Sequence, residues 1–116
     1  MANYTKVSTN GKARQELHAA LGLTGAEVSI NSMPAGAGVP FVHAHKLNEE
    51  IYFVTEGSGK AVIDGEEVAL AKGDWVRVAP EGKRQFFAGD NGISYICIQV
   101  KAGSLEGFTA DDAIIG

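Results

Sequence analysis

The stretch GAGVPFVHAHKLNEEIYFVTEG, residues 36–57, holds two of the chain's three histidines and a carboxylate at metal-ligand spacing. His43 and His45 are one residue apart, so on an extended strand both imidazoles project to the same face. A short break at residues 46–48 then lets the chain turn, and a run of strand-forming residues brings a carboxylate back beside the histidines. Imidazole is the commonest metal ligand in proteins. The pattern therefore predicts a metal site with two histidines, one acid and coordination positions left open.

This stretch resembles the first motif of the cupin family, which runs Gly, five residues, His-x-His, three or four residues, Glu, six residues, Gly. His43, His45, Glu50 and Gly57 fit this spacing, whereas the leading glycine falls at Ala37, between two glycines. The six-residue interval before Gly57 favours Glu50 over its neighbour Glu49 as the acid. The choice matters because one step along a strand turns the side chain to the other face.

The second cupin motif, which runs Gly, five residues, Pro-x-Gly, two residues, His, three residues, Asn, is matched more loosely. One extra residue precedes Pro80, Gln85 stands where the histidine belongs, and Gly89 replaces the asparagine. The resemblance covers about residues 36–100. It implies one divalent transition metal per chain, zinc, iron, manganese or nickel, with a ligand set of His43, His45, Glu50 and Gln85.

Short apolar stretches punctuated by glycine and proline follow Ala26, as is typical of an antiparallel sandwich or barrel. Asp64-Gly65 and Asn91-Gly92 are turn signals. We expect strands near 26–33, 40–45, 49–55, 59–63, 66–70, 74–79, 84–88 and 93–101. The resemblance implies that they form an all-β double-stranded β-helix, the jelly-roll cupin barrel, with a short N-terminal helix.

The segments on either side of the barrel carry weaker patterns. Apolar residues at helical spacing predict a short amphipathic helix over 11–21 that ends at Gly22. We expect one domain, with a helical extension over 1–25, the barrel over 26–101 and a packed C-terminal tail over 102–116. In the tail, Thr109 is expected to cap one or two helical turns. Its apolar residues are expected to pack on the barrel or on a partner, with a frayed terminus as the alternative: Phe108, Ile114 and Ile115.

Strand alternation also assigns the apolar residues to two faces. If the metal ligands point inward, aromatic side chains line the cavity as well. The candidate substrate-binding residues are Phe41, Tyr52, Phe87 and Tyr95. The opposite face is apolar as well, and such a face is usually covered. We therefore expect a homodimer formed through Ile51, Phe53, Ile96 and Ile98.

Composition excludes several classes of partner. Ten basic and fourteen acidic residues give a net charge of −4, without a basic cluster that could follow a phosphate backbone. Neither nucleic acid nor a membrane is expected as a partner, and without a signal-like apolar run the expected location is cytoplasmic. The single cysteine, Cys97, is expected to be a buried small hydrophobe.

Two functions follow from the resemblance. Cupins include dioxygenases, isomerases, decarboxylases and sugar-modifying enzymes, so one expectation is a metal-dependent reaction on a small polar molecule, with a dioxygenase or an isomerase as the leading classes. The alternative is a module that binds a sugar or an organic acid without converting it. A fold that hosts many reactions does not decide between them.

Overall fold

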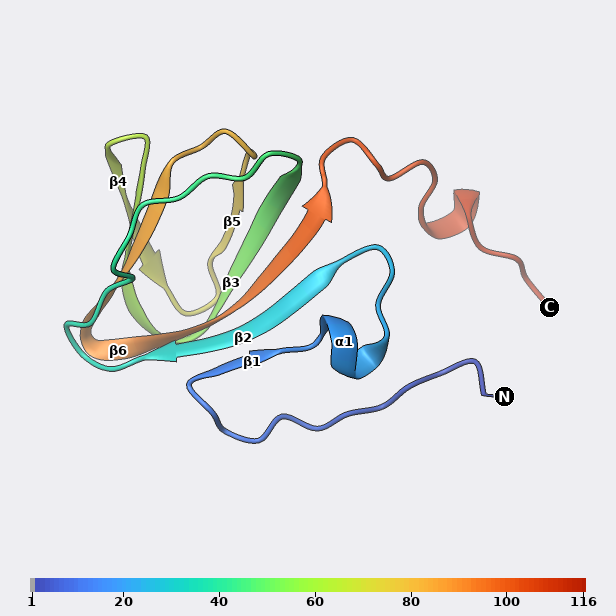
Figure 1. Cartoon of the computed structure of the whole chain (residues 1–116), viewed down its shortest axis with the longest axis horizontal. Coiled ribbons are helices and arrows are strands. Elements are labelled where there is room, and N and C mark those ends of the chain that lie inside the picture. The colour runs from blue at the N-terminus through green and yellow to red at the C-terminus, as the bar shows by residue number, and fades with distance from the viewer. Residues whose placement is uncertain (1) are drawn as a thin grey trace.

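The computed structural model describes residues 2–116 as one curved antiparallel sheet in the order β1-β2-β6-β3-β4, with β5 paired to β3 (Figure 1). The strands are β1 (Arg14–Glu16), β2 (Glu27–Met33), β3 (Asn48–Ile63), β4 (Glu66–Ala71), β5 (Trp75–Val78) and β6 (Arg84–Lys101). The helical elements are α1 (His18–Leu21) and the 3₁₀ turn η1 (Thr109–Asp111). This is the predicted all-β architecture.

The two longest strands, β3 and β6, each replace two predicted strands. Their pairing is irregular between Val54 and Glu56 and between Gly57 and Gly59, and these irregularities bend the sheet. The turn predicted at Asn91-Gly92 is wrong, because this pair lies inside β6. Gly92 has a φ of 76°, a conformation that lets the strand change direction without ending.

The hairpin predicted at Asp64-Gly65 is confirmed. The φ angles are 51° at Asp64 and 83° at Gly65, and two consecutive positive values are typical of the tight turns that join adjacent strands. The turn connects β3 to β4, which pair from Ser58 opposite Ala71 to Ile63 opposite Glu66.

The strand predicted over 40–45 is absent, and the chain crosses this region in irregular conformation. Two isolated bridges tie this part of the chain to β6, at Gly38 opposite Phe87 and His43 opposite Arg84. Pro40 lacks the N–H that a regular ladder needs, so the chain leaves β6 after Val39 and returns at His43. The return is fixed by reciprocal backbone bonds, from His43 N to Arg84 O at 3.1 Å and from Arg84 N to His43 O at 2.9 Å.

The helix predicted over 11–21 is wrong in its first half. Residues 14–16 form β1, which pairs with the edge of β2, and only His18–Leu21 is helical. Gly11 has a φ of 75°, outside the helical region, and the edge of β2 offers backbone groups that an extended segment can satisfy. The helix does end at Gly22, with a left-handed φ of 69°, as predicted.

The core lies inside the curved sheet and is formed mainly by inward residues of β3 and β6, with Leu70 from β4 and Val78 from β5. Its buried apolar members are Tyr52, Val54, Ala61, Leu70, Val78, Phe86, Ile93, Tyr95 and Cys97. Three of these rings form one cluster, with ring centres of Tyr52 and Phe86 4.2 Å apart and those of Phe86 and Tyr95 5.5 Å apart. The predicted burial of Cys97 is confirmed.

The C-terminal tail leads away from the barrel (Figure 1). Ile114 and Ile115 are 96% and 93% exposed, and Phe108 is also exposed, so the prediction that they pack on the barrel is wrong. Phe108 occupies the cap position of η1, while Thr109 lies within it at a φ of 52°. A three-residue turn has no face wide enough to bury these side chains. Across residues 2–116, every helix is too short or too polar to cross a membrane.

Candidate metal centre

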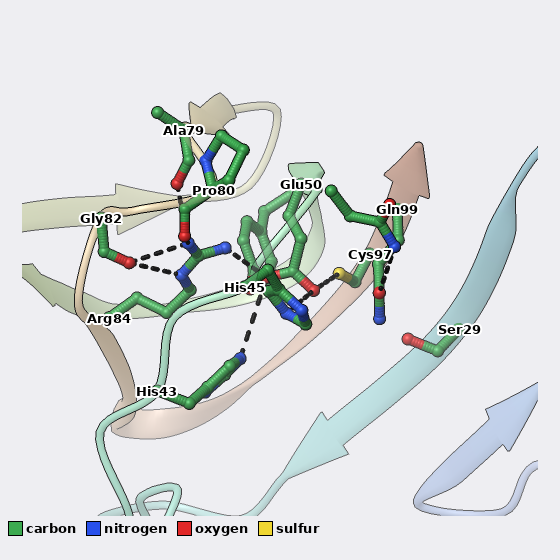
Figure 2. Close-up of polar contacts among 12 residues, drawn as sticks. Ser29, His43, His45, Glu50, Ala79, Pro80, Gly82, Arg84, Cys97 and Gln99 are labelled. Atoms are coloured by element: carbon green, nitrogen blue, oxygen red, sulfur yellow. Dashed lines mark hydrogen bonds and ion pairs between the residues drawn. The ribbon is translucent and has the colours of Figure 1, made fainter. Parts of the chain in front are cut away.

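His43, His45 and Glu50 meet in the wall of a cavity of about 600 Å³. One ligand atom from each residue can be chosen so that all lie within 4.8 Å of one another. His45 Nε2 is 3.2 Å from Glu50 Oε2, and His43 Nε2 is 3.9 Å from Glu50 Oε1 (Figure 2). The acid comes from β3, and both histidines come from the irregular segment before it, whose backbone bonds Arg84 at His43 and Pro80 at His45.

The imidazole nitrogens are the feature that suits an ion. His45 Nε2 and His43 Nδ1 are buried, and within residues 2–116 neither has a hydrogen-bond partner. Burying an unpaired nitrogen is unfavourable by about 1–3 kcal/mol. His45 Nε2 lies within ion-pair distance of Glu50 but does not form a hydrogen bond with it. A nitrogen and a carboxylate oxygen placed in this way are a donor set for a divalent cation, so the residues present fit a metal.

Glu50 is buried and ionised. Burial raises its pKa, but hydrogen bonds from the Tyr52 hydroxyl and from Arg84 lower it more, and the net pKa lies below the usual value. Both donors, Tyr52 Oη and Arg84 Nη1, bond Oε1, the latter at 2.7 Å. Oε2 faces His45, and the Cys97 thiol donates to it at 3.4 Å. Burial raises the pKa of Cys97 to about 12, so it remains a neutral thiol.

His43 is held in the neutral form that a metal ligand requires. Burial lowers its pKa, and the neighbouring His45 and Arg84 lower it too, against the opposing effect of the Glu50 carboxylate. The net pKa lies below the usual histidine value of 6.5. At neutral pH the imidazole therefore keeps a lone pair available.

Arg84 is the site residue that the sequence interpretation missed. Its side chain is 0% exposed, and Figure 2 shows it and Cys97 approaching Glu50 from opposite sides. Besides Glu50, the guanidinium bonds carbonyl oxygens in the loop between β5 and β6, at Ala79 (2.8 Å), Pro80 (3.1 Å) and Gly82 (2.8 Å). Arg84 therefore neutralises the buried carboxylate and fixes its position. Strand alternation with Phe86 as an inward residue is the signal that could have identified it.

Gln85, the predicted fourth ligand, lies between Arg84 and Phe86, which take the buried positions of this strand. Gln85 is half-buried in the cavity wall and donates from Nε2 to the carbonyl oxygen of Val39 at 2.7 Å. This bond directs the amide nitrogen to the backbone and leaves Oε1 as the atom available to a ligand.

The four aromatic candidates fall into three positions. Tyr52 and Tyr95 are buried and line the cavity, and Phe41 lines it while 58% exposed. Phe87 is not among the lining residues, and the Lys60 ammonium lies 5.7 Å from its ring centre. The inward position of β6 belongs to Phe86, so its neighbour Phe87 faces the other way, contrary to the expectation that it would bind substrate.

A curved antiparallel barrel with a His-x-His pair and an acid in its cavity defines the class of jelly-roll barrel proteins to which cupins belong. The cupin domain family model matches residues 30–98. The chain belongs to the cupin family.

Relatives of known structure share this fold. The chain is 60% identical to a cupin protein from Bacteroides fragilis, covering 100% of this chain and 99% of that one with a TM-score of 0.97. It is 25% identical to a sugar phosphate isomerase of the cupin superfamily from Silicibacter pomeroyi, covering 78% of this chain and 60% of that one with a TM-score of 0.66.

A curated sequence relative is an uncharacterised protein of Methanocaldococcus jannaschii. It is 35% identical over 49 residues, which are 42% of this chain and 38% of that protein. The matched region thus spans well under half the length of this relative.

Proposed function

We propose that this cupin binds one divalent transition ion through His43, His45 and Glu50 and uses it to hold or convert a small polar molecule in the adjoining cavity. The observation that carries the proposal is the buried, unpaired Nε2 of His45 beside an ionised carboxylate oxygen at 3.2 Å. A cavity of about 600 Å³ is within the range of small-molecule sites.

The chain's own residues supply most of what such a site needs. A divalent ion bound there would supply a Lewis acid with open positions toward the cavity. His43 and His45 offer neutral nitrogens and Glu50 offers charge, while Tyr52 and Arg84 hold the carboxylate in place. We include Gln85 as a fourth ligand through Oε1, a weaker donor than imidazole.

For the class of activity, we favour an isomerase over a dioxygenase. The support is the relative from Silicibacter pomeroyi, a sugar phosphate isomerase at 25% identity. The second candidate is binding of a sugar or an organic acid without turnover, because an amide in place of the fourth imidazole weakens the ligand set. Saturable binding without turnover in zinc-, iron- and manganese-loaded protein would favour this candidate.

Metal titration tests the proposal. Protein stripped with chelator and titrated with zinc at pH 7.5 should bind one ion per chain, measured calorimetrically and by elemental analysis. His45→Ala should bind it at least tenfold more weakly, about 1.4 kcal/mol, because one of the three ligands is gone.

His18→Ala is the matched control, because His18 lies on α1 and bonds the carbonyl of Ala26 outside the cavity. It should leave zinc affinity unchanged. Parent and His45→Ala proteins with equal affinity and stoichiometry would refute the site. In the same titration, Gln85→Ala should weaken zinc less than His45→Ala does, and an unchanged affinity would remove Gln85 from the ligand set.

We also propose a homodimer through the outer face of the sheet, where Ile51 pairs with Ile98 and Phe53 with Ile96 across β3 and β6. Phe53 stacks on Trp75 with ring centres 4.1 Å apart, and Trp75 is 64% exposed. Phe53→Glu should shift the protein to monomer in sedimentation equilibrium, because it buries a charge in an apolar contact. Phe108→Glu, at an exposed ring in the tail, should have no effect. A parent that is monomeric at high concentration would exclude the dimer.

A further inference from the structure

A second group of polar side chains lines the same cavity on its β1 side, away from the metal ligands. The sheet register places Arg14 opposite Asn31 and Asn31 opposite Tyr95, across β1, β2 and β6. Ser29 lies opposite Cys97 in the neighbouring row, and Figure 2 shows it on β2, on the side of the site away from Arg84. The side chains of this group all line the cavity: Arg14, Ser29, Asn31 and Tyr95.

Hydrogen bonds orient the guanidinium of Arg14 in this group. Arg14 Nη1 donates to Asn31 Oδ1 at 2.7 Å, and Asn31 Nδ2 donates to Ser29 Oγ at 3.0 Å. Asn31 and Ser29 are only 6% and 3% exposed, so the arginine is hydrogen-bonded to a buried part of the wall. A guanidinium has five N–H groups in a planar fork, and one bond to Asn31 and one to Glu16 leave others free.

Two hydroxyl groups beside the arginine have free donors. Ser29 Oγ accepts the bond from Asn31, so its own O–H is available. The hydroxyl of Tyr95 forms no hydrogen bond with any residue in 2–116, although the ring is buried in the cavity wall. Burial raises the pKa of Tyr95 to about 12, so the hydroxyl stays protonated and can donate.

The charge of the cavity wall is positive at this position. Apart from the histidines, the charged lining residues are Arg14 and Glu50. The carboxylate of Glu50 is already paired with the buried Arg84 at 2.7 Å. Arg14 contacts Glu16 at 3.3 Å, but both side chains are more than half exposed, and exposed pairs of this kind contribute little. Arg14 is therefore free to pair with an anion that enters the cavity.

We propose that the cavity takes a small molecule with one anionic group, a carboxylate or a phosphate ester, held by Arg14 with the hydroxyl groups of Ser29 and Tyr95. This inference rests on the proposed function, since the polar oxygens at the other end of the same molecule would face His43, His45 and Glu50. A planar guanidinium matches both carboxylate and phosphate in geometry.

The test compares three probes of one carbon skeleton, namely glucose, gluconate and glucose 6-phosphate, by calorimetric titration into zinc-loaded and into chelated protein. At least one of the two anions should bind to the parent ten or more times as tightly as glucose does. Arg14→Ala should reduce that preference to less than twofold, and Arg14→Lys should restore part of it by keeping the charge.

Glu16→Gln is the matched control on the same short strand, and it should keep the preference. Far-UV circular dichroism and the melting temperature establish that each variant is folded. Saturable binding of neither anion by the parent, or a preference that survives in Arg14→Ala, would overturn the proposal. The anion proposal and the metal proposal can fail independently. Arg14→Ala should bind zinc with the affinity of the parent. A parent protein that binds no zinc but shows an anion preference that depends on Arg14 would overturn the metal proposal alone.

Discussion

Replacing Gly57 with alanine should lower the free energy of unfolding by roughly 3 kcal/mol. Gly57 has a φ of 75°, and a Cβ there would lie 2.9 Å from the carbonyl carbon of Gly92 and collide with its oxygen. The obstacle is backbone of β6, which cannot rotate away as a side chain can. β3 and β6 would have to separate next to the bend in their pairing, at the pair Gly57 and Ile93.

Gly103→Ala is the matched control. Its φ of 73° is nearly the same, but nothing lies within 4 Å of an added Cβ. This variant should lower the free energy of unfolding only by the cost of a left-handed backbone conformation for alanine, about 1–2 kcal/mol. Urea denaturation of parent and both variants separates the two effects, and equal losses at Gly57 and Gly103 would show that the pairing of β3 with β6 at Gly57 tolerates a methyl group. The result would explain why the first cupin motif ends in glycine.

Arg84→Met should destabilise the fold by about 3–5 kcal/mol, because it leaves the buried carboxylate of Glu50 without its cation. It also removes donors from the carbonyl groups of Ala79, Pro80 and Gly82, which fix the loop between β5 and β6. Methionine keeps most of the side-chain volume, so the loss reports the charge and the hydrogen bonds more than a cavity.

Arg77→Met is the comparison for Arg84. Arg77 bonds Glu49 at 2.6 Å, but its side chain is 59% exposed, and such pairs contribute at most about 1 kcal/mol. The double variant Arg84→Met, Glu50→Gln should recover part of the loss, because it removes the uncompensated charge. A loss for Arg84→Met no greater than for Arg77→Met would mean that Glu50 does not depend on this arginine.

The sequence predicted the acid and the two histidines because their spacing is local. His43, His45 and Glu50 lie close along the chain, and the structure brings them together. The three side chains do not come together in the predicted way, because the histidines lie on an irregular segment and not on a strand. Their position depends on backbone bonds to Arg84 and Pro80, partners distant in sequence that local pattern does not reveal.

The remaining differences come from tertiary pairing. Residues 11–21 have helical periodicity, but residues 14–16 pair with the edge of β2 and form a strand. This pairing places Arg14 at the cavity. On β6, the motif alignment identified Gln85, whose side chain lines the cavity, but not its neighbour Arg84, which is buried and holds the carboxylate of Glu50. Arginine is rarely buried, so residue type alone predicts an exposed side chain at position 84. Its burial is explained by the ion pair with Glu50, which the sequence does not reveal.

β3 and β6 continue through the bends in their pairing, so the parts of the barrel on the two sides of the bends share these two strands. Their pairing joins residues as far apart as Asn48 and Lys101, and most of the hydrogen-bonded ladder forms only after such distant segments meet. A topology of this kind predicts slow, all-or-none folding, in which no stable subdomain precedes the complete barrel. The cavity is therefore assembled in the same event as the core.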